Sequence, residues 1–163
     1  MSIQHITLFN NKKTSFISNM DITRLDNATK CYISVSKFEA VKGILSDAIL
    51  AGLTDFIVLY IDNARNTYST LGGNNVFQST MVDTFMSNNL IQKNNYNYST
   101  FSYASSQDKW VEFNINNLNS LKISFKNVEI GLANKANLMI DLVEEDIPTD
   151  TFIYSLSLNI KFE

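Results

Sequence analysis

The chain has 163 residues, a length that ordinarily folds as one domain with a sizeable core. Hydrophobic residues make up 45% and aromatic residues 12% of it, which argues against an intrinsically disordered protein. The net charge of −3 and the pI of about 5.1 disfavour nucleic-acid binding, because that usually needs a basic face.

Cysteine usage and hydropathy give expectations about location. Cys31 is the only cysteine, so no intrachain disulfide can form, and a reducing compartment is expected. The first residues lack a basic segment followed by an apolar run, and no apolar run approaches the ~20 residues of a membrane span. We therefore expect neither a signal peptide nor a transmembrane segment.

The first part of the chain predicts short strands. Residues 3–9 can form a strand, followed by a polar turn at 10–13 and a short partner strand at 14–18. Residues 19–29 are polar and are typical of a loop. Residues 30–35 alternate between apolar and polar side chains, which predicts another strand.

The next segment predicts a helix. Ser36 and Glu39 have the spacing of a capping box, in which each side chain accepts a hydrogen bond from the backbone of the other residue. Gly52 stands where a helix C-terminus favours a residue with positive φ. Apolar residues follow at helical spacing, namely Phe38, Val41, Ile44 or Leu45, Ala48, Ile49 and Leu53. The pattern predicts an amphipathic helix at residues 37–51.

The middle of the chain is less regular. Residues 56–61 form a continuous apolar run rich in β-branched side chains, which predicts a strand buried on both faces beneath the helix. Residues 62–75 are polar and predict a long loop. Residues 76–90 leave two alternatives open, a short helix or a broken strand. Residues 94–97 predict a loop and residues 98–103 another strand.

The last third carries the clearest β pattern. In residues 152–162 nearly every second side chain is apolar, which predicts a strand with one face in the core and one in water. Before it, the same reasoning predicts strands at 110–115, 121–125 and 138–143, a connection at 127–137 and a loop at 144–150. The fold class predicted for residues 1–163 is one mainly β domain with one or two helices, an antiparallel β-sandwich or jelly roll.

No residue set predicts catalysis. His5 is the only histidine, so a Ser-His-Asp or Cys-His device would have to use it, and it stands in no nucleophile motif. Cys31 has no neighbour in sequence that would lower the pKa of its thiol, which favours a buried structural role. We therefore predict no catalytic residue and no enzyme activity.

Two further groups of residues were considered as binding sites. Glu144, Glu145, Asp146 and Asp150 form the densest carboxylate cluster, but they lack the EF-hand pattern, and a solvated loop is the simpler interpretation. One histidine and one cysteine cannot supply a zinc site, so no metal or cofactor is predicted. The aromatic residues that could form a ligand platform or a subunit interface are Tyr96, Tyr98, Tyr103 and Trp110.

The last third also resembles a known family. Residues 118–126, residues 138–145 and the final strand, with the asparagine-rich composition and the lack of cysteine pairs, are similar to the small jelly-roll minor capsid and penton proteins of virophages and related double-stranded DNA viruses. The resemblance covers residues 110–163, and the predicted helix has no counterpart in it. It implies a structural role with self-assembly and brings no catalytic residues.

Two functions follow as alternatives. The first is a non-enzymatic viral structural or assembly protein that forms homo-oligomers and contacts other virion proteins, in the virion or the host cytoplasm, without nucleic-acid or membrane partners. The low content of charged residues, 18%, supports it because uncharged surface is more easily buried against a subunit. The second is a small ligand-binding or glycan-binding β-sandwich module, because fold alone does not choose between these functions.

Overall fold

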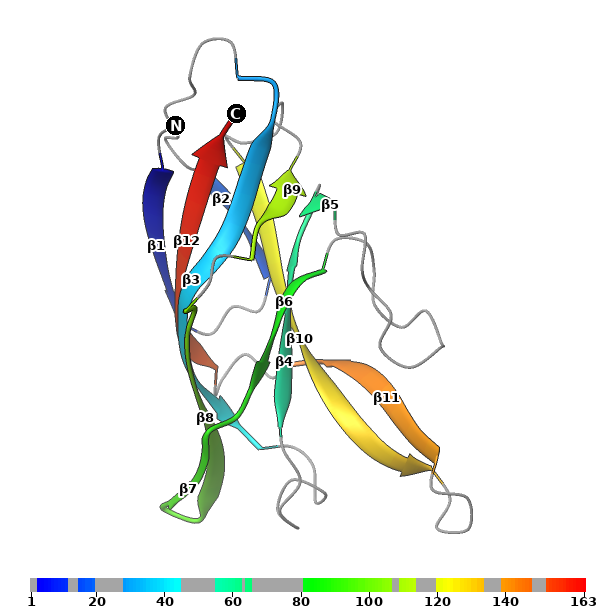
Figure 1. The fold of residues 1–163 in the computed structure, drawn as a ribbon. Helices are drawn as coiled ribbons and strands as arrows, with labels where there is room; N and C mark the ends of the chain where they lie inside the picture. The colour runs from blue at the N-terminus through cyan, green and yellow to red at the C-terminus, as the bar shows by residue number, and fades with distance from the viewer. Residues whose placement is uncertain are drawn as a thin grey trace.

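The computed structural model describes residues 3–11, 15–19, 28–44, 55–62, 64–65, 81–106, 109–113, 120–133, 139–147 and 152–163. These residues form twelve β-strands and no helix, and the strands lie in two antiparallel sheets that face each other (Figure 1). The mainly β, sandwich-like fold class predicted from the alternating pattern is therefore confirmed.

The first sheet, sheet A, has seven strands. Five of them lie in the order β1 (Ile3–Asn11), β12 (Ile153–Phe162), β3 (Cys31–Gly43), β8 (Tyr96–Ala104) and β7 (Asn89–Lys93). The short strand β9 (Val111–Phe113) pairs with the N-terminal end of β3 and with β5 (Ala64–Arg65). The long strand β3 thus pairs with β8 and β9 one after the other along the same sheet.

The second sheet, sheet B, has five strands. Four lie in the order β11 (Met139–Asp146), β10 (Ser120–Ala133), β4 (Phe56–Ile61) and β6 (Met81–Met86), and β2 (Ser15–Asn19) also pairs with β10. The far end of β10 pairs only with β11 among the described strands, and Figure 1 shows this two-stranded ribbon leaving the body of the sandwich.

The two halves of the chain pair with each other in reverse order. β1 pairs with β12, β2 with β10, β3 with β8, and β4 with β6, always antiparallel. Two further pairings, β12 with β3 and β10 with β4, join these pairs into the two sheets. The fold therefore resembles one long antiparallel hairpin rolled up so that successive pairs alternate between the sheets.

The helix predicted at 37–51 is wrong where the structure describes it. Residues 37–43 continue β3, and Ser36 forms no cap, since its Oγ donates to the Ser157 carbonyl oxygen at 3.2 Å. Ser36 is the extra residue of a β-bulge opposite Ser157 and Leu158, and it switches the buried positions of β3 from odd to even numbers. The spacing of three from Val35 to Phe38 comes from this bulge and not from a helical turn. Residues 45–51 lie outside the described residues.

Several predicted boundaries also change. Strand β2 pairs with β10 in the other sheet and not with β1, because successive strands cross between the sheets. Asn10 and Asn11 belong to β1 and not to a turn. The connection predicted at 127–137 is strand up to Ala133, and the loop predicted at 144–150 is strand up to Asp146, because these segments pair with each other.

In the middle of the chain the loop predicted at 62–75 contains the short strand β5 at Ala64–Arg65, and three other predictions compare as follows. Of the alternatives for 76–90, the described residues 81–90 confirm the broken strand, with β6 and β7 separated by residues 87–88. The loop predicted at 94–97 reduces to a two-residue hairpin turn. Its residues, Asn94 and Asn95, have φ of 52° and 65°, values that asparagine tolerates better than most residues. The strand at 56–61 is buried along almost its whole length, as its apolar run predicted.

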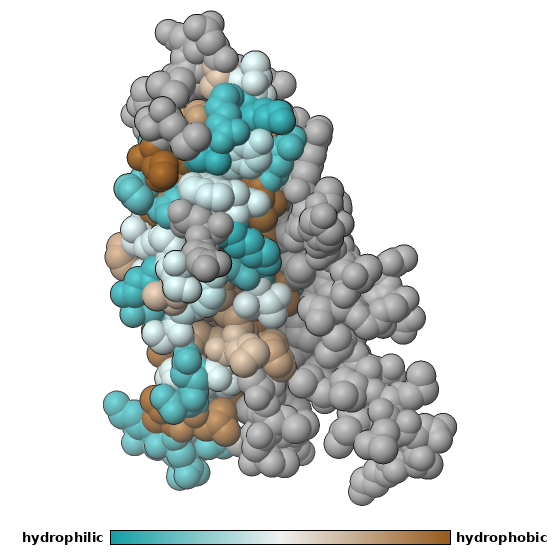
Figure 2. Space-filling view, in the orientation of Figure 1, coloured by the Kyte–Doolittle hydropathy of each residue, from teal (hydrophilic) through white to brown (hydrophobic). Residues whose placement is uncertain are grey.

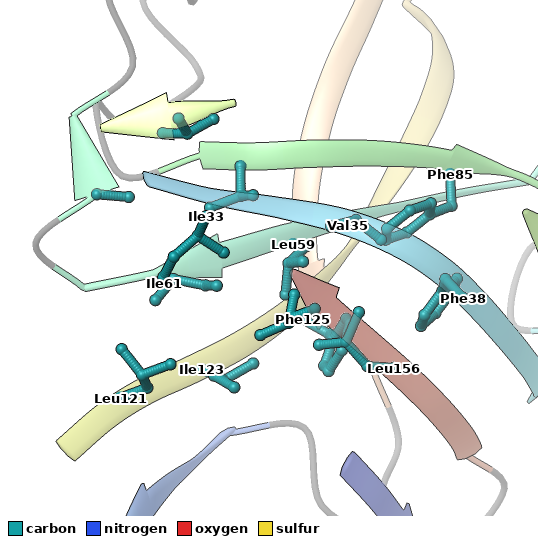
Figure 3. Close-up of a cluster of buried hydrophobic side chains, with 14 of the residues drawn as sticks. Ile33, Val35, Phe38, Leu59, Ile61, Phe85, Leu121, Ile123, Phe125 and Leu156 are labelled. Carbon is teal, nitrogen blue, oxygen red and sulfur yellow. The ribbon is translucent and has the colours of Figure 1, made fainter. Parts of the chain in front are cut away.

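Inward-pointing side chains from both sheets form one hydrophobic core (Figure 3). Phe38 of β3 lies near its middle, with its ring stacked at 4.1 Å on Phe85 of β6 and at 5.6 Å on Phe125 of β10. Leu156 of β12 and Leu59 of β4 are also fully buried there. Burial of large apolar side chains from facing strands is the main free-energy term that holds the sheets together.

A polar cluster crosses the same interface near the end of β3. Lys42, only 1% exposed, directs its Nζ to Asp55 Oδ1 at 2.7 Å and also to the side-chain oxygen of Asn127. Lys42 belongs to sheet A, Asn127 to sheet B, and Asp55 directly precedes β4. The cluster therefore connects the two sheets through buried charged and polar groups.

The alternation along β3 is tested by placing a charge at neighbouring positions. Ala40 is buried on the inner face and Val41 is 41% exposed on the outer face. Ala40→Asp is expected to lower the free energy of unfolding by about 3 kcal/mol or more, because it buries an unpaired carboxylate. Val41→Asp should change it by less than about 1 kcal/mol.

Urea unfolding at low protein concentration measures both variants. The predicted helix at 37–51 would reverse the order, since its apolar face includes position 41 and leaves position 40 in solvent. A larger loss for Val41→Asp than for Ala40→Asp would therefore contradict the strand.

Candidate interaction surface

The outer face of sheet A carries apolar side chains where a sandwich normally exposes polar ones. Phe9 of β1 is 79% exposed, Ile153 of β12 is 55% exposed, and Ile91 of β7 is 48% exposed. Val41 of β3 and the partly exposed Tyr98 of β8 lie between them. We call these five residues the outer stripe.

Strand register places the outer stripe diagonally across five adjacent strands. Ile153 pairs with Val41, and Tyr98 pairs with Ile91. Phe9 pairs with Ser155, two positions from Ile153 on the same face of β12. Paired residues and residues two apart point to the same side of a sheet, so the stripe is continuous across the face.

The outer stripe borders a hollow of about 400 Å³. Phe9, Val41 and Ile153 line it together with small polar residues such as Thr100 and Ser102. Beside the hollow the charges of Lys37 and Glu39 cancel, because Lys37 Nζ lies 2.9 Å from Glu39 Oε1. Lys93 lies on the same face at the other end of the outer stripe, opposite Tyr96. Apolar side chains also gather over β7 and β8, at the lower end of the face in Figure 2.

The four predicted aromatic residues do not form a single platform. Tyr96 and Tyr98 lie at the start of β8 on the outer face, and Tyr96 is strongly exposed. Tyr103 points to the opposite face of β8 and packs inward, with its ring 5.2 Å from that of Phe85. Trp110 precedes β9, and its ring lies 5.0 Å from Lys161 Nζ, which also lies 4.8 Å from the ring of Tyr32. Only Tyr96 and Tyr98 share a face, where Tyr98 belongs to the outer stripe and Tyr96 lies beside it.

The residues considered for catalysis are separated as well. His5 lies on the outer face of β1, and its Nδ1 is 2.7 Å from Asn159 Oδ1. Cys31 begins β3 and is completely buried, and this burial raises the pKa of its thiol from 9.0 to about 12. A buried thiol with a raised pKa is a poor nucleophile.

Among the described residues, no three histidine, cysteine, aspartate or glutamate side chains lie close enough together to hold a metal ion. Of the carboxylate cluster, Glu144, Glu145 and Asp146 end β11, and Asp150 lies outside the described residues. The described part of the chain also contains no helix long and apolar enough to cross a membrane.

Comparison with known proteins gives one structural likeness. No family model matches the chain, and no curated protein matches it in sequence. Among solved structures, the crystal structure of the selenomethionine-labelled mavirus penton protein is similar over 99% of both chains, with a TM-score of 0.42 and 10% sequence identity. Values this low assign no family to the chain.

The sequence interpretation missed most of the outer stripe. The sequence pattern places Val41 on the buried face of a helix, and it predicts strands at Phe9 and Ile153 without indicating a surface role for them. A local signal exists at Ile153, which breaks the polar side of an otherwise regular alternation in residues 152–162. The stripe as a whole arises from β1, β12, β3, β8 and β7, which no local pattern brings together.

The buried thiol gives a test of this geometry. Because the pKa of Cys31 is raised in the folded protein, its thiolate is disfavoured there, and a thiol-specific reagent should react at pH 8 only through unfolded molecules. The same shift means that stability is retained below pH 9 and is lost progressively as the pH rises from 9 toward 12.

Labelling rates measured across a urea series should follow the unfolded fraction, and a Cys31→Ser variant should not be labelled. Rapid stoichiometric labelling without urea would contradict the buried position of Cys31.

Proposed function

We propose that the chain is a non-enzymatic structural protein of a virion, and that it assembles with copies of itself through the outer stripe of sheet A. The observation that carries this proposal is the continuous exposed apolar surface on five adjacent strands of a regular sheet. Exposed apolar surface of this kind marks an interaction site more often than a solvated face.

The chemistry of this face favours a second copy of the chain as its occupant. When identical or neighbouring patches of one protein meet, net charge on the patch would repel its counterpart. Here the apolar side chains are accompanied by hydroxyl groups and by the Lys37–Glu39 ion pair, which leaves no net charge beside the hollow. Tyr96 and Tyr98 extend the surface with aromatic side chains, which are common at subunit interfaces.

The strand order supports a jelly roll as the type of β-sandwich. Nested pairing of the first half of the chain with the second half, with pairs alternating between two sheets, is the winding of a double Greek key. The resemblance of residues 110–163 to virophage capsid and penton proteins is the reason for proposing a role in the virion. The same proposal includes three further points. Residues 1–163 form one domain, the protein contacts other virion proteins, and it is located in the virion or the host cytoplasm.

Two isoleucines on the outer face provide a matched test. Ile153 lies in the outer stripe, whereas Ile3, 45% exposed, stands at the opposite end of β1 beside Lys161. Ile153→Asp places a charge in the proposed interface and is expected to weaken self-association at least about tenfold. Ile3→Asp adds the same charge outside it and should leave the dissociation constant within about twofold.

Sedimentation velocity over a concentration series gives the dissociation constant of the natural chain and of the two variants. Circular dichroism shows whether each variant is folded. Equal weakening by both substitutions, or none by Ile153→Asp, would locate the contact elsewhere and overturn the proposed surface.

A further inference from the structure

The polar cluster between the sheets has an unusual composition for a sandwich core. Lys42, Asp55 and Asn127 are at most 2% exposed. Asp55 follows Lys42 by 13 residues, and Asn127 follows it by 85. The Lys42 amino group contacts both the carboxylate and the carboxamide. An amine, a carboxamide carbon and a proton-transfer group are therefore held together in the part of the molecule that excludes water.

A buried ion pair is a weak way to stabilise a core, because removing two charges from water costs several kcal/mol per ion. The cost is largest where a charged group lacks hydrogen bonds, and Asp55 Oδ2 has no hydrogen-bond partner among the described residues. An amide formed from Lys42 and Asn127 would remove this free-energy cost, since both charges disappear and Asp55 becomes a neutral carboxyl group.

We propose that folding leads to a covalent isopeptide bond between Lys42 Nζ and Asn127 Cγ, with Asp55 transferring the protons. The proposal adds a self-modification site in the core and does not depend on the assembly function of the outer stripe.

The reaction balances without any co-reactant. Asp55 takes one proton from the Lys42 ammonium, and the neutral amine then attacks Asn127 Cγ, so that a new C–N bond forms and the carbonyl π electrons move to Oδ1. Asp55 gives its proton to Asn127 Nδ2 and takes a second proton from Nζ. The carbonyl re-forms, the Cγ–Nδ2 bond breaks, and ammonia leaves. Of the three ammonium hydrogens, one stays on the new amide, one leaves in ammonia and one remains on Asp55.

The positions of the two residues give the bond a structural consequence. Lys42 is near the end of β3 in sheet A, and Asn127 lies within β10 of sheet B, 85 residues later in the chain. The bond would link the two sheets directly and close a long loop, which restricts the unfolded chain. It would serve a structural protein in the way that a disulfide does, without requiring an oxidising compartment.

The first test is the intact mass of the purified full-length protein under denaturing conditions. The bond predicts a mass about 17 Da below that of the unmodified chain, which is the mass of one ammonia. Tryptic digestion should then give a linked pair consisting of residues 38–65 and residues 127–135, because trypsin does not cleave after a modified Lys42. A loss of ammonia within residues 127–135 alone would identify a cyclised asparagine and overturn the proposal.

Matched variants separate the chemistry from the fold. Asp55→Asn keeps both linked residues and should abolish the mass loss, whereas Asp62→Asn, at a half-exposed aspartate that pairs with Lys122, should retain it. Lys42→Arg should abolish the loss and Lys37→Arg, at an exposed lysine on the same strand, should retain it.

Asn127→Asp provides a positive control for the bond itself. The aspartate variant condenses with loss of water, about 18 Da, and must reach the same final mass as the linked natural chain. If a variant fails to fold, the natural chain still decides the question. A natural chain with the full sequence mass and separate 127–135 and unmodified 38–42 peptides would overturn the proposal.

Discussion

The structure depends on the antiparallel pairing of the first half of the chain with the second half. β1 and β12, at opposite ends of the sequence, pair along nine residues, and every pair nested inside them joins segments that are closer together in the sequence. This topology places two sheets face to face, so the inward side chains of each strand meet those of a distant strand in one core. Because nearly all of these contacts are non-local, the core and both sheets are expected to form together.

Strand β3 connects the core to the two features with potential function. Its bulge at Ser36 changes which residues face inward, and as a result Val41 points to solvent while Lys42 points into the core. Val41 completes the outer stripe, and Lys42 forms the contact between the sheets with Asp55 and Asn127. The exposed outer stripe and the inner cluster that joins the sheets therefore meet at neighbouring residues of one strand.

The same residues show where prediction from the sequence succeeded and failed. Two strands were predicted correctly, one from the alternation in residues 152–162 and one from the apolar run at 56–61. Each of these patterns reflects the burial of that segment alone. The helix at 37–51 was predicted from the spacing of Ser36 and Glu39, from Gly52 and from apolar residues at helical spacing. The strand is not evident from the sequence there, because Val41 is apolar but exposed and Lys42 is charged but buried, which inverts the usual pattern. The exposure of Val41 follows from the bulge opposite Ser157 and Leu158, and the buried Lys42 contacts Asp55 and Asn127. A local sequence pattern contains neither the bulge nor these contacts. The outer stripe could not be predicted for the same reason, since it requires the strand order.

We propose that this protein acts through the outer stripe of sheet A. The most direct test of this proposal is the mass of the purified natural chain in solution, measured by light scattering after size exclusion over a wide range of concentrations. We expect a discrete oligomer whose mass is a whole-number multiple of the 18.5 kDa chain. A mass of 18.5 kDa at every concentration would contradict it, because the outer stripe would then remain exposed without a second copy to cover it.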